Sequence, residues 1–169
     1  MATIRRLARE DDRSSFTCGQ PELDEFFRRQ AWQHQSKRAS VTYVATEGDQ
    51  LVGFVTVCPG TLIREDLGPA FRHHPPFPLP ILLVARLGVS SSAHRQGIGA
   101  TLLKHSLRLT VSLIETVGCV GVVVDAKPDS VAFYEKYGFR RISTTVGRFQ
   151  RLFLPVSAIP PAEEQGPGF

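Results

Sequence analysis

The spacing of hydrophobic residues predicts that helices and strands alternate along this chain. Ala2–Ala8 fits a first short strand. Pro21–Gln35 fits a helix, because Leu23, Phe26 and Phe27 fall on one stripe while the charged residues lie elsewhere. Proline is tolerated in the first helical turn, because the N–H groups there make no intrahelical hydrogen bond and a missing N–H breaks none. The N-terminal part is therefore expected to form one strand and one amphipathic helix.

Two extended runs and a long irregular segment follow. Ser40–Thr46 and Gln50–Cys58 are rich in β-forming residues, and Glu47-Gly48-Asp49 between them is typical of a tight hairpin. Pro59–Pro80 is rich in proline and glycine, which predicts a long surface loop. A loop of this length in a small domain is often a binding or lid element, so we expect it to border a binding site.

The second half of the chain begins with a strand and a long helix. Ile81–Val89 is nearly continuous apolar sequence, as is typical of a strand covered on both faces. A helix is predicted from Ile98 to Val117, and Gly118 is expected to end it. The residues predicted to face mostly inward on this helix are Ile98, Leu102, Leu103, Leu109, Leu113 and Ile114.

The remaining elements complete a mixed α/β fold. Val120–Ala126 is predicted to be a buried strand, and Asp129–Tyr137 a short helix. Arg140–Thr144 and Arg148–Leu154 are expected to close the sheet as an antiparallel pair. The polar, proline- and glycine-rich tail at 160–169 is predicted to be disordered.

Length and composition favour one compact, soluble domain. The chain has 169 residues, of which 42% are hydrophobic and 21% charged, so a single domain over residues 1–159 is expected. No apolar run approaches the roughly 20 residues that a membrane-spanning helix needs. The N-terminus lacks the apolar stretch of a signal peptide, which predicts a cytoplasmic protein. The widely spaced Cys18, Cys58 and Cys119 are expected to be reduced, with Cys119 buried.

The net charge of +4 indicates that the protein binds an anionic partner. Arginines and a lysine occur in adjacent or near-adjacent pairs, and a nucleotide cofactor, an RNA or an acidic protein would suit them. For any single pair, a solvated surface without a partner is the alternative. The paired cations are Arg5 and Arg6, Arg28 and Arg29, Lys37 and Arg38, Arg140 and Arg141, and Arg148 and Arg151.

The segment between the strand at Ile81–Val89 and the following helix carries the first candidate chemistry. A helix N-terminus offers free backbone N–H groups and a partial positive charge, and both favour a bound phosphate. Gly97 and Gly99 lack a Cβ, so an anion can come close to the backbone there. His94 and Arg95 add side-chain donors. Taken alone, this pattern fits an ordinary turn at the start of a helix equally well.

Two motifs together resemble the GNAT superfamily of acetyltransferases. The family's acetyl-CoA loop reads Gln/Arg-x-x-Gly-x-Gly/Ala, and Gly97-Ile98-Gly99-Ala100 matches it, with Gln96 where that residue is common. His94 replaces the family's first Gln or Arg, and Arg95 stands where glycine is common. Further along, 130–139 is similar to the family's A-x-x-FY-x-x-x-GF segment, although Ser130 replaces the alanine.

The resemblance implies a fold, a cofactor and a cofactor site. The implied fold has a central, mostly antiparallel sheet flanked by helices, with acetyl-CoA bound at a splay between two parallel central strands. The implied contacts lie at the end of one strand, in the loop and helix start after it, and on one downstream aromatic residue. The residues concerned are Leu87, Gly88, Val89, His94, Arg95, Gln96, Gly97, Ile98, Gly99, Ala100 and Phe133.

The resemblance also assigns a catalytic role to Tyr134. An amine attacks the thioester carbonyl and a thiolate must leave, and a phenol with a pKa near 10 can give that thiolate a proton. The alternative is that Phe133 and Tyr134 are core aromatic residues only. No Asp or Glu stands out as a base, which suits an acceptor amine that is already neutral. No cluster of metal ligands is evident, because the adjacent His73 and His74 lack nearby cysteines or carboxylates.

One branch of the superfamily, the GNAT toxins of toxin–antitoxin systems, is resembled more closely. Phe16-Thr17-Cys18-Gly19, followed by 23–27, is similar to its F-x-CG…LD-x-FL opening, and Arg86-Leu87-Gly88-Val89 is similar to its GRLAV strand. The branch implies acetylation of the α-amine of aminoacyl-tRNA and restraint by a small ribbon-helix-helix antitoxin. The cations that this predicts for tRNA contact are Arg28, Arg29, Lys37, Arg38 and Arg86. Independently of the branch, exposed helices and edge strands could support a homodimer.

Two other functions stay open at this point. An N-acetyltransferase for a small-molecule or protein amine needs the same acetyl-CoA site but no surface for tRNA. A binding module would hold acetyl-CoA, or a partner, without turnover.

Overall fold

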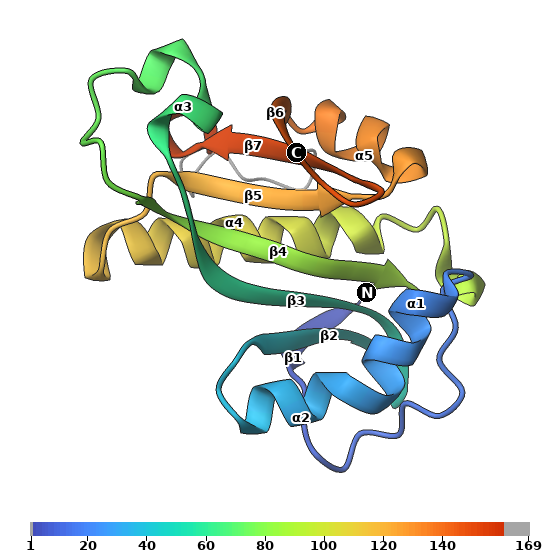
Figure 1. Ribbon diagram of the computed structural model, residues 1–169. Helices are drawn as coiled ribbons and strands as arrows, with labels where there is room; N and C mark the ends of the chain where they lie inside the picture. The colour runs from blue at the N-terminus through green and yellow to red at the C-terminus, as the bar shows by residue number, and fades with distance from the viewer. Residues whose placement is uncertain (1, 161–169) are drawn as a thin grey trace. The chain divides into compact units, whose positions relative to one another are not determined.

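The computed structural model describes residues 2–160, with the side chains of 143–146 excepted. Seven strands form one sheet in the order β1-β2-β3-β4-β5-β7-β6 (Figure 1). The chain folds as two compact units, and we describe each by itself. Unit 1 comprises the residues up to Cys58 together with Val84–Ser106, and unit 2 comprises Pro59–Leu83 together with the chain from Leu107 onward.

The strands of unit 1 confirm the predicted hairpin. β1 (Thr3–Arg6) pairs antiparallel with β2 (Val41–Glu47), which in turn pairs antiparallel with β3 (Gln50–Leu62). Gly48 in the connecting turn has φ +58, the left-handed conformation that such turns require. β4 (Leu79–Val89) follows β3 in the sheet order.

The helix predicted over Pro21–Gln35 is present but contains an irregular turn. α1 (Pro21–Glu25) continues into the π-helical segment η1 (Phe26–Gln30) and then α2 (Ala31–Ser36). Figure 1 shows α2 beside β2 within this unit. In η1 the Ala31 N–H donates to the Phe26 carbonyl, and Arg13 Nη1 donates to the Phe27 carbonyl at 3.1 Å. Phe26 and Phe27, the first two residues of this turn, are both buried.

Aromatic rings form the core of unit 1. Phe27 and Phe54 are fully buried, and their rings stack at 4.3 Å between centroids. Phe16 meets the edge of Phe27 at 4.7 Å. Burial of each ring contributes about 1.5–3 kcal/mol relative to exposure. This cluster attaches the helical segment and the N-terminal loop to the sheet. Its buried members are Leu7, Phe16, Cys18, Phe26, Phe27, Ala31, Val44 and Phe54.

Unit 2 is built on an antiparallel set of strands. β5 (Gly121–Ala126) and β6 (Arg140–Val146) each pair with β7 (Phe149–Pro155), which confirms the predicted closing pair (Figure 1). Asp125 and Arg151 face each other across β5 and β7, with two hydrogen bonds of 2.7 and 3.0 Å. This hydrogen-bonded carboxylate raises the pKa of Arg151. The short helices of this unit are α3 (Arg64–Leu67), η2 (Pro69–Phe71), η4 (Pro128–Ser130), α5 (Val131–Lys136) and η5 (Val156–Ala158).

The prediction of a long irregular loop over Pro59–Pro80 was wrong in part. β3 continues to Leu62, α3 and η2 follow, and β4 begins at Leu79. Leu67 and Phe71 are buried in a core with Phe153, whose ring lies 5.4 Å from that of Phe71. Prolines and glycines dominated the sequence pattern, whereas the apolar side chains of Leu67 and Phe71 anchor the segment.

The long helix and the cysteines need smaller corrections. α4 (Ile98–Thr116) confirms the predicted helix, but Ile114 is 40% exposed and Leu107 is buried instead. All three cysteines are free, as predicted, but the buried one is Cys18 and not Cys119. Among the described residues, no helix combines the length and apolar character needed to span a membrane. The predicted disordered tail lies, from residue 161 on, outside the described residues.

Candidate active site

The loop that joins β4 to α4, Ser90–Gly97, is anchored at its first residues. We call it the cofactor loop; it includes the 3₁₀ turn η3 (Ser91–Ala93). The Ser90 N–H donates to the Val52 carbonyl at 2.9 Å, and the Ser91 N–H donates to the Thr17 carbonyl at 2.8 Å. His94 Nε2 lies 2.8 Å from the Val89 carbonyl oxygen. β3 and the N-terminal segment therefore both fix where this loop leaves the sheet.

Two residues near the end of the cofactor loop have left-handed backbone conformations. Gly97 has φ +77, and Arg95, which is not a glycine, has φ 64. A Cβ built on Gly97 would meet nothing within 4 Å. The backbone therefore borders open space, directly before the hydrogen bond from the Thr101 N–H to the Gly97 carbonyl that begins α4. An anion could approach the chain closely there.

The start of α4 has the properties that a pyrophosphate requires. The first turn of any helix has backbone N–H groups without intrahelical acceptors, and the dipole of a 19-residue helix adds partial positive charge. The first turn contains no acidic residue. His94, Arg95, Gln96 and Gly97 are exposed, Ile98 is buried, and Gly99 and Ala100 are half-buried. The residues present therefore fit the phosphates of coenzyme A.

The end of β4 packs closely against the aromatic core of unit 1. Gly88 is buried, and a Cβ built on it would lie 2.8 Å from Phe54 Cε1 and 3.4 Å from Cys18 Sγ. A glycine is therefore required by close approach of the aromatic core. Leu87 and Val89, on either side, are half-buried. In unit 1 the end of β4 at Leu87–Val89, the cofactor loop and the first turn of α4 follow one another directly.

Tyr134 and Phe133 lie on α5 in unit 2. Tyr134 is 7% exposed, and its ring meets the edges of Phe133 at 5.0 Å and Phe139 at 5.7 Å. Burial raises the pKa of Tyr134 well above its ordinary value of about 10. A raised pKa keeps the phenol protonated throughout the physiological range. Its side chain can therefore donate a proton or a hydrogen bond, but it does not supply a phenolate at neutral pH.

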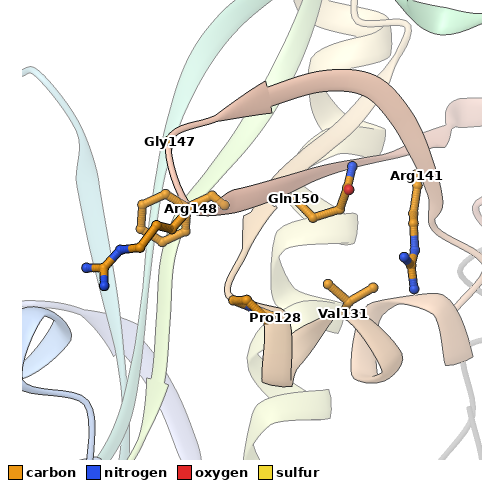
Figure 2. Close-up of a pocket in the computed structure, with 7 residues that line it drawn as sticks. Pro128, Val131, Arg141, Gly147, Arg148 and Gln150 are labelled. Carbon is orange, nitrogen blue, oxygen red and sulfur yellow. The ribbon is translucent and has the colours of Figure 1, made fainter.

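Sequence reasoning missed a shallow cavity beside α5 in unit 2. Figure 2 shows Arg141 directed toward α5, where its Nη2 binds Glu135 Oε1 at 3.1 Å. In the same view Arg148, at the turn between β6 and β7, extends away from Val131 and Gln150. The walls come from two separate sequence segments, 128–131 and 141–150, so no local pattern marks the cavity. Its lining residues are Pro128, Val131, Arg141, Gly147, Arg148, Phe149 and Gln150.

The five cations predicted to contact tRNA fall into two groups. Arg28 donates from Nε and Nη2 to the Phe16 carbonyl, with the Nε distance at 2.8 Å, and is half-buried. The Arg86 guanidinium lies 4.4 Å from the centre of the Phe26 ring and is also half-buried. These two side chains therefore stabilise unit 1. The exposed group consists of Arg29, Lys37 and Arg38.

Comparison with known proteins assigns the family. The model of the acetyltransferase (GNAT) domain matches residues 38–141, which is more than half of the chain. A tRNA-acetylating toxin of Mycobacterium tuberculosis is 29% identical over 136 residues, covering 80% of this chain and 82% of the relative. A probable toxin TacT of Sinorhizobium fredii is 26% identical over 160 residues, covering 88% of this chain and 87% of the relative.

Solved structures agree with the family match. The structure of AtaT complexed with acetyl-methionyl-tRNAfMet aligns with a TM-score of 0.84 at 25% identity, covering 94% of this chain and 97% of that one. AtaTR bound with acetyl-CoA aligns with a TM-score of 0.78 at 26% identity, covering 94% and 95%. These matches, with the loop and helix geometry described above, show that the chain belongs to the GNAT family of acetyltransferases.

Proposed function

We propose that this enzyme transfers the acetyl group of acetyl-CoA to the α-amine of aminoacyl-tRNA and thereby blocks translation. The observation that carries the proposal is similarity along most of the chain to a tRNA-acetylating toxin, at 80% coverage. The exposed start of α4 supports it, because it offers a pyrophosphate site without any acidic residue in the first turn.

The residues of unit 1 hold the cofactor in this proposal. Acetyl-CoA supplies an activated acetyl thioester. The backbone N–H groups at the start of α4 bind its pyrophosphate, and Gly97 lets the phosphates come close to the main chain. Arg95 and His94 add cationic or polar donors from the exposed part of the cofactor loop. Backbone N–H groups at the end of β4, around Gly88, are the proposed donors to the carbonyl oxygen as negative charge gathers on it.

Tyr134 is the proposed general acid. Its phenol is protonated at neutral pH because burial raises its pKa, so it can release a proton from Oη to the departing sulfur. No general base is assigned. An α-amine beside an ester has a lower pKa than the lysine ε-amine, which titrates near 10.4, so a substantial neutral fraction exists at pH 7.

An exposed basic surface at the end of α2 is the proposed point of tRNA contact. Lys37 and Arg38 follow α2 directly, and Arg29 is 77% exposed on η1, where its Nε lies 3.6 Å from Glu25 Oε1. Such cations bind a phosphate backbone through charge and with little dependence on sequence. A tRNA substrate places the enzyme in the cytoplasm, and the family resemblance favours a small DNA-binding antitoxin as its partner.

The experiment that tests the proposal is acetyl transfer from labelled acetyl-CoA. We expect the label to appear on charged tRNA and to be released, with the amino acid, when the aminoacyl ester is cleaved by mild base. Uncharged tRNA should accept none. Transfer to simple amines or lysine peptides, with none to charged tRNA, would contradict the proposed acceptor while leaving the acetyltransferase assignment in place.

A further inference from the structure

The N-terminal motif Phe16–Gly19 contacts the cofactor loop in unit 1, and Asp24 on α1 binds this motif. Asp24 is only 7% exposed. Its Oδ1 accepts a hydrogen bond from the Cys18 N–H at 2.8 Å, and its Oδ2 accepts one from Thr17 Oγ1 at 3.0 Å. No cation pairs with this carboxylate within the described part of the chain. A buried carboxylate without a cationic partner is costly, which indicates a role that offsets its cost.

The peptide group between Thr17 and Cys18 extends the contact to the cofactor loop. Its N–H donates to Asp24, and its carbonyl accepts from the Ser91 N–H at 2.8 Å. In a trans peptide the N–H and C=O point in opposite directions, so one rigid group joins the carboxylate to the loop. A carboxylate acceptor polarises the peptide and strengthens the carbonyl as an acceptor, as in other hydrogen-bond chains. One peptide group thus separates Asp24 from Ser91, the second residue of the cofactor loop.

Neighbouring contacts fix the same peptide from other sides. The Phe16 carbonyl accepts hydrogen bonds from Arg28, and Cys18 packs beneath Gly88 at the end of β4. Gly19 has φ +86, and a Cβ on it would lie 3.8 Å from Ser91 Oγ. The motif therefore contacts the end of β4 and the start of the cofactor loop, two of the segments that the proposed acetyl-CoA site uses in this unit.

We propose that Asp24 is a positioning residue for acetyl-CoA: it fixes the Thr17–Cys18 peptide, which holds the cofactor loop in the conformation that leaves the start of α4 open. Asp24 touches neither cofactor nor acceptor and acts through Thr17, Cys18 and Ser91. The inference rests on the proposed acetyl-CoA site. It gives the N-terminal motif a function that core packing alone does not supply.

The test compares coenzyme A binding by purified full-length variants, using isothermal titration calorimetry. Asp24→Ala removes both acceptors, Asp24→Asn keeps an acceptor for Cys18, and Thr17→Val removes only the hydroxyl. We expect Kd to rise about tenfold in Asp24→Ala, which loses both hydrogen bonds, and about two- to threefold in the other two variants, which keep the hydrogen bond from Cys18. The Ser91 amide should exchange with solvent faster in Asp24→Ala, and KM for acetyl-CoA should rise more than kcat falls.

Thr42→Val is the matched control. Thr42 and Thr56 share a buried hydrogen bond of 2.7 Å in the same unit, away from the cofactor loop. This variant should lose stability while Kd for coenzyme A and Ser91 exchange stay unchanged. Equal Kd values for Asp24→Ala and the wild type would overturn the proposal, as would an equal rise in Thr42→Val. If Asp24→Ala does not fold, Thr17→Val and Asp24→Asn decide by the same criterion. A wild type that fails to bind coenzyme A contradicts the proposed function itself, and the positioning role falls with it.

Discussion

Replacing Tyr134 with phenylalanine is expected to lower kcat for acetyl transfer by about 10²–10⁴-fold, the usual contribution of a positioned acid. Coenzyme A affinity should stay within about twofold of the wild type, a difference well under 1 kcal/mol. The ring remains, so its packing against Phe133 and Phe139 is kept. Stability should change little, because the phenol oxygen makes no hydrogen bond to any residue that the structure describes. Steady-state kinetics, calorimetry and thermal unfolding measure the three quantities.

The control and the pH profile distinguish an acid from a packing residue. Tyr43→Phe, on β2 of unit 1, removes the hydroxyl group from a ring that packs at a tilt against His105, and should leave kcat unchanged. Because the pKa of Tyr134 is raised, the phenol keeps its proton up to about pH 10. Loss of this proton should therefore not lower kcat up to that pH. A kcat for Tyr134→Phe within threefold of the wild type would mean that Tyr134 is a core residue.

Replacing Gly97 with alanine is expected to raise KM and Kd for acetyl-CoA by about tenfold or more. The added methyl group would project into the space before α4 where backbone and pyrophosphate must approach each other. The φ of +77 also makes alanine unfavourable by about 1–2 kcal/mol. The measurement is coenzyme A calorimetry together with a denaturant titration.

Gly48→Ala separates these two effects. Gly48 has φ +58 in the hairpin turn of the same unit, and a Cβ there also meets nothing within 4 Å. It should lose similar stability but bind coenzyme A normally. If both variants lose affinity equally, the effect of Gly97 comes from backbone strain and not from the anion site.

The order of the elements was predictable because most of them have a strong hydrophobic period. The buried strands at Ile81–Val89 and Val120–Ala126 and the helix from Ile98 were placed within two residues of their observed bounds. Pro59–Pro80 was not, since its core contacts depend on the single residues Leu67 and Phe71. Periodicity also failed at the end of α4, where Ile114 continues the apolar pattern but is exposed.

The candidate site was easiest to propose where the backbone itself would be the ligand. Glycines before a helix fit such a site or an ordinary turn equally well, and only the second family motif favoured the site; in the structure Gly97 has the left-handed φ of +77. Side-chain roles were harder, because charge alone does not tell a surface cation from a structural one. Arg28 and Arg29 are neighbours in sequence, yet Arg28 binds the Phe16 carbonyl and Arg29 is exposed. Asp24 went unrecognised because its partners are a hydroxyl and a backbone N–H.

Cell-free translation tests the central claim most directly. The purified wild type with acetyl-CoA should stop translation and leave acetylated aminoacyl-tRNA, which mass spectrometry of the released amino acids identifies. The wild type without acetyl-CoA, and Tyr134→Phe with it, should leave translation running. Unchanged translation in the presence of a wild type that binds acetyl-CoA would contradict the claim that aminoacyl-tRNA is the acceptor.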